Sequence, residues 1–186
     1  IKLLLPKVKE SGLGIVPTSS TTNQLSIGDA LAIAVMNKNR FGKLDFKKFH
    51  PSGSLGNKLK TAGDLMLTKG KIPFINENQV IRNALKIINI KRLGFLVAIN
   101  NEGLTTGIFT DGDLKRLMQK RKSIENLRIK SFMTKSPYVV EERMLASDVL
   151  HQMNKKKITN VCVYRKNNKK KTIGVIHIHN LLNNLS

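Results

Sequence analysis

The part of the chain that follows Gly63 repeats itself. The segment GIFTDGDLKRLM, from Gly107, has the same pattern as GVIHIHNLL, from Gly174. The tripeptide DLM at 64–66 likewise corresponds to SFM at 131–133. Matching residues lie 67 positions apart in three pairs: Met66 and Met133, Gly107 and Gly174, Leu114 and Leu181. A period of this size indicates two copies of one supersecondary unit.

Each copy has the same predicted order of elements. A leading segment, KIPFI or SPYVV, precedes a helix whose apolar residues recur at three- and four-residue spacing. Two apolar runs joined by a polar turn then predict a β-hairpin, and a short amphipathic helix closes the unit. The sequence therefore predicts βαββα twice. One unit of this size buries little apolar surface, so we expect the two units to pack face to face.

The region before the repeat has a different pattern. The Ser/Thr-rich stretch TSSTTNQ predicts a loop, and apolar residues at helical spacing from Ile27 predict an amphipathic helix that ends near Asn39. A short helix, KLDFKKF, and a loop, HPSGSLG, follow. The opening IKLLLPKV resembles a strand already under way, so we expect the chain to be a fragment of a longer protein.

Composition restricts the function classes. The 186 residues include 33 Lys and Arg against 12 Asp and Glu, a formal net charge of +21. The basic residues are scattered, aromatic residues make up only 5%, and Trp is absent, so a nucleic-acid surface is not expected. The charge favours anionic small ligands instead. The single cysteine, Cys162, excludes an intrachain disulfide, and no apolar run approaches membrane-spanning length; a cytoplasmic setting is expected.

The repeat resembles the CBS domain, and the pair resembles a Bateman module. The resemblance rests on GIFTDGD at 107–113, a Gly-x-x-Thr-x-x-Asp run where a strand turns into a helix. It implies a nucleotide site in which Gly107 admits the ligand, Thr110 binds phosphate at a helix N-terminus, and Asp113 binds ribose hydroxyls. The alternative is purely structural, with Thr110 or Asp111 capping the helix.

The second copy departs from this pattern, because His177 and Asn180 stand where the first copy has Thr and Asp. If one cleft binds a ligand, we expect it to be the first, with Asn78 and Ser131 as further lining residues. Helix capping and turn formation are the alternative for these two side chains. The motif HIH at 177–179 does not predict zinc, because alternate residues should diverge and no third ligand is evident.

The whole chain resembles the arabinose-5-phosphate isomerase family, in which a sugar isomerase (SIS) domain precedes two CBS domains. The resemblance rests on three ordered features: PTSSTT with GDALA, FHPSGSLG, and the repeat. Ser52 replaces the glycine usual in that loop. The implied fold is α/β: the C-terminal part of a flavodoxin-like SIS domain at 1–56, a linker at 57–63, and CBS domains at 64–122 and 130–186.

The resemblance implies interconversion of D-ribulose 5-phosphate and D-arabinose 5-phosphate through an enediol(ate), for the synthesis of Kdo in lipopolysaccharide or capsule. His50 would belong to the active site, placed there by subunit association in a homo-oligomer, by resemblance a tetramer. Substrate binding is assigned to Thr18, Ser19, Ser20 and Thr21, whose alternative role is helix capping.

The catalytic Glu and Lys of the family are expected upstream of this chain, which by itself should be inactive. No cofactor or metal is expected. The CBS pair would bind a nucleotide or nucleotide-sugar effector. The competing hypothesis is a free-standing CBS nucleotide-sensing module without catalysis.

Overall fold

The structure is a computed structural model that describes residues 2–50, 56 and 58–185. The chain divides into two compact units, Ile1–Pro51 and Ser52–Ser186, and each is described by itself. Most of the predicted loop that follows His50, Ser52 included, lies outside the described residues. None of the described helices is both long and apolar enough to cross a bilayer.

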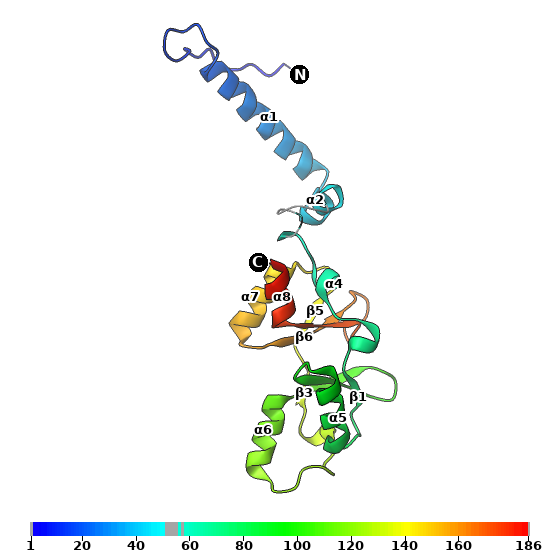
Figure 1. The fold of residues 1–186 in the computed structure, drawn as a ribbon. Helices are drawn as coiled ribbons and strands as arrows, with labels where there is room; N and C mark the ends of the chain where they lie inside the picture. The colour runs from blue at the N-terminus through cyan, green and yellow to red at the C-terminus, as the bar shows by residue number, and fades with distance from the viewer. Residues whose placement is uncertain (1, 51–55, 57, 186) are drawn as a thin grey trace. The chain divides into compact units, whose positions relative to one another are not determined.

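The described residues of the first unit form two helices, α1 (Ser19–Lys38) and α2 (Lys43–Phe49), preceded by extended chain and turns (Figure 1). Neither helix contains a buried residue, so the predicted apolar face of α1 has no core beneath it. The predicted strand at the start of the chain is absent from residues 2–10, because a strand requires a partner to receive its hydrogen bonds. No sheet of an SIS domain is present in the described part of this unit.

The helix α1 begins earlier than predicted. The hydroxyls of Thr21 and Thr22 donate to the carbonyl oxygen of Thr18 at 2.8 and 3.0 Å, and Thr22 N–H donates to the same oxygen at 3.0 Å. The Ser/Thr run therefore forms the first turn of the helix rather than the loop that precedes it.

The second unit confirms the prediction of βαββα twice. In the first repeat, a short helix α4 (Ala62–Leu65) and a 3-10 turn η1 (Lys69–Lys71) precede β1 (Phe74–Asn76), α5 (Ile81–Lys91), β2 (Phe95–Ile99), β3 (Thr105–Thr110) and α6 (Asp111–Lys120). In the second repeat, η2 (Ile129–Ser131) and β4 (Thr134–Lys135) precede β5 (Val139–Glu141), α7 (Ala146–Lys156), β6 (Asn160–Tyr164), β7 (Gly174–His177) and α8 (Ile178–Leu185).

The two sheets exchange their leading segments. One sheet has the order β1-β2-β3-β4, with β1 parallel to β2, and the other has the order β5-β6-β7. Strand β4 belongs to the second repeat in sequence, yet it pairs with β3, where Ile108 is opposite Thr134. Reciprocally, Leu67 from the start of the first repeat exchanges backbone hydrogen bonds of 2.8 and 3.0 Å with Val175 in β7. Neither repeat is complete without the other.

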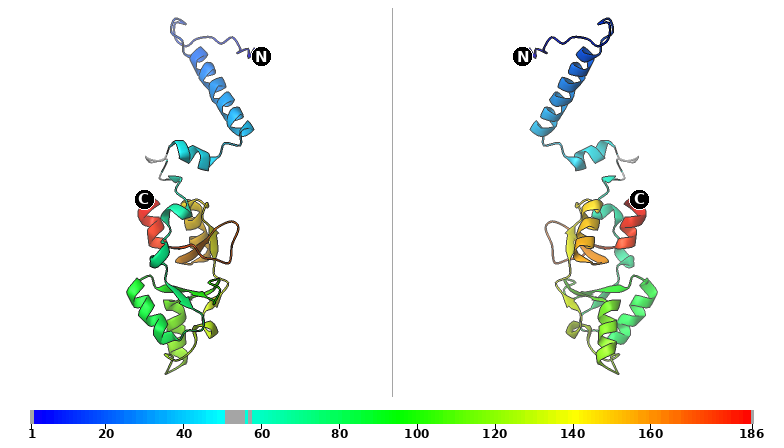
Figure 2. Two further views of the ribbon diagram at one scale, coloured as in Figure 1. Left: turned by 90° about the vertical axis from the view of Figure 1, so that its right-hand side faces the viewer. Right: turned by 90° about the vertical axis from the view of Figure 1, so that its left-hand side faces the viewer.

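Apolar residues form three clusters in this unit. One lies under α5 and α6 and includes Ile81 and Phe109; a second lies under α7 and α8 and includes Met153 and Leu181. The third cluster joins the two sheets and consists of Ile72, Phe95, Val97, Cys162 and Val175. Figures 1 and 2 show the strands of both repeats between the helix pair α5 and α6 and the helix pair α7 and α8. The predicted face-to-face packing is confirmed.

Candidate functional site

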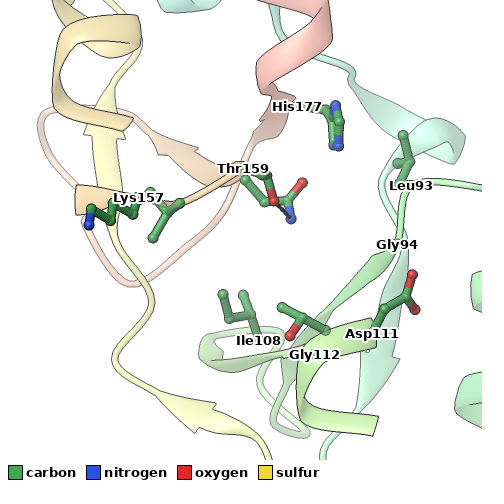
Figure 3. A pocket seen from close by; sticks show the side chains of 11 residues that line it. Leu93, Gly94, Ile108, Asp111, Gly112, Lys157, Thr159 and His177 are labelled. Carbon is green, nitrogen blue, oxygen red and sulfur yellow. Dashed lines mark hydrogen bonds between the residues drawn. The ribbon is translucent and has the colours of Figure 1, made fainter. Parts of the chain in front are cut away.

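A cavity of about 420 Å³ lies between the two repeats, where β3 turns into α6 and β7 turns into α8 (Figure 3). The first repeat lines it with Leu93, Gly94, Ile108, Thr110, Asp111 and Gly112. The second repeat lines it with Lys157, Ile158, Thr159, Asn160 and His177. Ligand sites in proteins commonly enclose about 300–1,000 Å³, so the cavity can hold a small molecule.

Equivalent positions of the two repeats face this one space. Thr110 and His177 occupy corresponding ends of β3 and β7, and Gly94 corresponds to Thr159 at the starts of β2 and β6. The residues are not chemically equivalent: the first repeat contributes the carboxylate of Asp111, while the second contributes the imidazole of His177 and the polar side chains of Thr159 and Asn160. The two sides of the cavity therefore differ in charge.

On the first-repeat side, the predicted ligand residues Thr110 and Asp113 bind each other. The Thr110 hydroxyl accepts the N–H of Asp113 at 3.2 Å and donates to its carboxylate at 2.8 Å, and the Thr110 N–H also donates to that carboxylate at 2.9 Å. Arg116 forms an ion pair with the same carboxylate. Asp113 is only 8% exposed and lies outside the cavity lining. This reciprocal cap starts α6 and leaves Asp113 no oxygen without a partner.

The neighbouring Asp111 differs from Asp113 in every one of these respects. It is exposed, it lines the cavity, and no hydrogen bond or ion pair engages its carboxylate among the described residues. Gly94 lies directly over it: a Cβ on Gly94 would come 3.1 Å from Asp111 Oδ2, and Gly94 has a φ of +70°. A glycine at this position therefore keeps the carboxylate accessible.

On the second-repeat side, His177 takes the place of Thr110. Its Nδ1 accepts the N–H of His179 at 3.3 Å, which places the neutral ring's proton on Nε2. Burial, and then the proximity of His179, lower the pKa of His177 below its ordinary value. The two rings lie 4.9 Å apart, so the prediction that they diverge is wrong. Even so, the described residues contain no group of three or more His, Cys, Asp or Glu that could hold a metal.

Asn160, Thr159 and Lys157 complete this side and were not predicted from the sequence. The Asn160 amide donates to Thr159 Oγ1 at 3.0 Å, while its oxygen is buried without a partner among the described residues. Figure 3 shows Thr159 and His177 facing the cavity and the amino end of Lys157 turned away from it. The repeat could have identified this turn, because Lys157 ends α7 in the same left-handed conformation in which Arg92 ends α5.

The other predicted nucleotide residues lie outside the cavity lining. Gly107 serves packing: a Cβ there would lie 2.7 Å from the Thr134 carbonyl oxygen and 2.8 Å from Met133 Sδ. The backbone N–H of Asn78 donates to Asn76 Oδ1 in the turn before α5. Ser131 is exposed at the end of η2. The structure does not bring these residues to Thr110.

In the first unit, a carboxylate already occupies the N-terminus of α1. Glu10 accepts the Thr18 N–H at 2.7 Å, the Thr18 hydroxyl at 3.0 Å, and the Ser20 N–H at 3.3 Å. Hydrogen bonds from the Ser20 side chain and the Thr18 backbone lower the pKa of Glu10 to about 2. Glu10 was not predicted from the sequence. Ser19 and Thr21 lie in the same first turn, where Thr21 bonds back to Thr18.

His50 lies at the C-terminal end of α2 and is exposed. Its ring stacks on Phe46, with centroids 4.1 Å apart, and Nδ1 lies 3.3 Å from the Phe46 carbonyl oxygen. These local contacts hold the imidazole against its own helix.

The CBS domain family matches residues 62–120 and 129–186, which together make up more than half of the chain. The chain belongs to the CBS domain family. The matched ranges coincide with the two structural repeats, so the cavity lies between two CBS domains.

Curated relatives of this CBS protein include arabinose 5-phosphate isomerases named KdsD. The KdsD of Salmonella typhi is 40% identical over 171 residues, which are 91% of this chain and 51% of that protein. The KdsD of Escherichia coli K12 is 38% identical over the same shares. The chain therefore spans about half the length of the curated relatives it matches.

Solved CBS structures share the fold at lower identity. A structure of CBSX2 in complex with AMP is 22% identical, has a TM-score of 0.55, and covers 66% of this chain and 93% of that one. The CBS pair of protein MJ0100, in complex with 5′-methylthioadenosine and S-adenosyl-L-methionine, is 19% identical with a TM-score of 0.60, and covers 67% and 94%.

Proposed function

We propose that the CBS pair binds a nucleotide or nucleotide-sugar in the cavity between its repeats and acts as the regulatory module of an arabinose-5-phosphate isomerase. The observation that carries the proposal is the cavity itself, which both repeats line with polar groups that lack partners in the described chain. The ligands of CBSX2 and of the MJ0100 pair, all adenosine compounds, support this class of effector.

The catalytic part of the proposal rests on similarity to the KdsD proteins. In the proposed reaction a base removes the proton next to the sugar carbonyl, and an enediol(ate) forms between D-ribulose 5-phosphate and D-arabinose 5-phosphate. Imidazole suits proton transfer between oxygens near neutral pH, a role we assign to His50. Its exposed position fits a residue that acts in a cleft completed by another subunit of a homo-oligomer.

The assignment of substrate binding to Thr18, Ser19, Ser20 and Thr21 carries a condition. A substrate phosphate at the N-terminus of α1 must displace the Glu10 carboxylate, which holds the same N–H and hydroxyl groups. Glu10 is ionised at neutral pH because its pKa is about 2, so the two anions would repel each other. The role in Kdo synthesis and the cytoplasmic setting belong to the same proposal.

A CBS nucleotide-sensing module without catalysis is the second candidate. One observation favours it: the family match and the cavity both lie within the two CBS domains.

The deciding experiment is an isomerase assay with D-arabinose 5-phosphate on the full-length gene product that contains this chain. We expect turnover that falls roughly a hundredfold in His50→Ala, the size of a typical general acid–base contribution. His151→Ala, at an exposed position of α7, is the matched control and should keep full activity. Turnover that survives His50→Ala would remove the catalytic assignment, and no turnover at all would favour the sensing module.

A further inference from the structure

We propose that a groove between α5 and α6 of the first repeat is a docking site for an acidic amphipathic helix of a partner protein. This α5–α6 groove encloses about 570 Å³ and is lined by Leu85 of α5, by Leu114 and Met118 of α6, and by residues 121–125, which follow α6. It shares no lining residue with the cavity between the repeats, so the proposal is independent of the nucleotide site.

The floor of the α5–α6 groove is apolar. Leu85, Leu114, Met118 and Ile124 come from three segments of the chain and line the same hollow. Met118 is 60% exposed, although the neighbouring residue on α6, Leu117, is buried in the core. Methionine is flexible and polarizable, which suits it to contact apolar side chains of a partner. The described chain therefore leaves apolar surface accessible in this groove.

The second repeat shows that the fold does not require such a surface. There α7 packs directly against α8, and Leu181, which corresponds to Leu114, is fully buried. In the first repeat, α5 and α6 make only slight contact, and Leu114 stays half-buried. The hollow beside α7 and α8 is lined mainly by polar side chains, with Leu150 and Leu185 as its apolar residues. The open apolar floor therefore distinguishes the first repeat from the second.

Two cations border this floor. The guanidinium of Arg121 lies over the ring of Phe132, with Cζ 5.5 Å from the ring centroid, which restrains its position. Lys122 forms no hydrogen bond or ion pair with any described residue. The described lining contains one acid, Glu125, and its Oε2 already accepts Arg82 Nε at 3.0 Å. The positive charges of Arg121 and Lys122 are therefore left for a partner to neutralise.

These features favour an acidic helix over other occupants. A second copy of the chain would bring the same two cations into an isologous contact, and each copy carries a formal net charge of +21, so repulsion opposes it. A nucleic acid would neutralise the cations but has no aliphatic side chains to cover the floor. A helix with leucines on one face and glutamates beside them matches both the floor and its border, and helices commonly bind apolar grooves in this way.

The test is a fluorescence-anisotropy titration of the full chain with a labelled synthetic helix of about four turns. The peptide carries leucines at i, i+3, i+4 and i+7 and glutamates at the flanking positions. We expect Lys122→Glu to weaken binding roughly tenfold, because an attractive charge contact becomes repulsive. Met118→Ser should weaken it several-fold through lost apolar contact. Lys166→Glu and Ile90→Ser are matched changes at exposed positions outside the groove lining and should bind like wild type.

The proposal is overturned if wild type does not bind the helix, or if Lys122→Glu and Met118→Ser bind it as tightly as wild type. Equal binding of a peptide with lysines in place of the glutamates, or alanines in place of the leucines, would also overturn it. A dimer in light scattering that Met118→Ser dissociates would assign the groove to a second copy instead. Melting curves show whether each variant keeps the fold. Lys122 lies beyond the end of α6, so its variant provides the test even if Met118→Ser unfolds.

Discussion

The two strand-to-helix junctions of the repeat occupy equivalent places and are built differently. In the first repeat, Thr110 and Asp113 close a reciprocal cap, and Arg116 neutralises the carboxylate. In the second, His177 caps α8 through Nδ1, and Asn180, at the position of Asp113, carries no charge.

A shared motif position therefore does not carry a shared role. The residue that matches the family pattern best, Asp113, is committed to holding its own helix. Among the described residues that line the cavity, Asp111, two positions earlier, has no partner for its carboxylate, and His177 stands where the pattern is broken.

The largest effect should come from the glycines that let the repeats exchange their leading segments. Gly107→Ala should lower the free energy of unfolding by about 1–3 kcal/mol, because its Cβ would meet a backbone oxygen of Thr134 that cannot move without disturbing β4. Adding Met133→Ala should not restore stability, since that oxygen remains. Denaturant unfolding of the single and double variants measures this.

Gly174→Ala tests the position of the second repeat that corresponds to Gly107. The three atoms closest to its added Cβ all belong to the Met66 side chain, so Met66→Ala should recover part of the loss. A double-mutant cycle should therefore give strong coupling between residues 66 and 174 and weak coupling between residues 107 and 133. Equal coupling in both cycles would show that the two contacts are alike.

Removing the capping carboxylate should have the next largest effect. Asp113→Ala should lower the free energy of unfolding by about 2 kcal/mol, since it removes the cap of α6 and leaves the half-buried N–H and hydroxyl of Thr110 without their acceptor. Asn180→Ala, at the equivalent position, should change it by less than about 0.5 kcal/mol. Thermal unfolding measures the difference, and similar losses in both variants would contradict the contrast between the junctions.

A smaller effect should follow where the two hairpins meet. Thr105 Oγ1 lies 2.7 Å from Thr172 Oγ1 and accepts the Thr172 N–H at 3.2 Å. Thr105→Val should lower the free energy of unfolding by about 1 kcal/mol, the net value of such bonds. Thr105→Ser retains the hydroxyl and should remain close to wild type; a loss as large as that of the valine variant would assign the effect to the missing methyl group.

The smallest effect should be the pH dependence that distinguishes His177 from Thr110. Burial, and then His179, lower the folded-state pKa of His177 below its ordinary value of 6.5. The unfolded chain then binds the proton more readily, so stability is complete above pH 6.5 and is lost as the pH falls through the lowered pKa. Melting temperatures between pH 7.5 and 5 should fall less steeply in His177→Gln than in wild type.

The predicted elements of the second unit follow from local patterns in the sequence. The helical spacing of apolar residues such as Ile81 and Ala84 and the polar turn before β3 are properties of short segments, and the 67-residue period appears when the chain is aligned with itself. Each predicts a helix or strand whose apolar face requires a partner, and so the paired βαββα units could be predicted.

The candidate site was predicted less completely, because hydrogen bonds and neighbours across the repeat decide which side chains are free. Nothing in GIFTDGD distinguishes Asp113, which caps α6, from Asp111, whose carboxylate has no partner among the described residues. The role of Gly107 depends on Met133 and Thr134, which belong to the other repeat.

In the first unit, the helix α1 could be predicted from the sequence, but the residue at which it begins could not. The sequence of α1 predicts a helix with an apolar face, since that depends on residue spacing alone. Where the helix begins was decided by Glu10, which reaches its N-terminus from eight residues before Thr18. Local spacing is fixed by the covalent chain, whereas partners for hydrogen bonds and apolar faces come from segments that only the folded structure brings together.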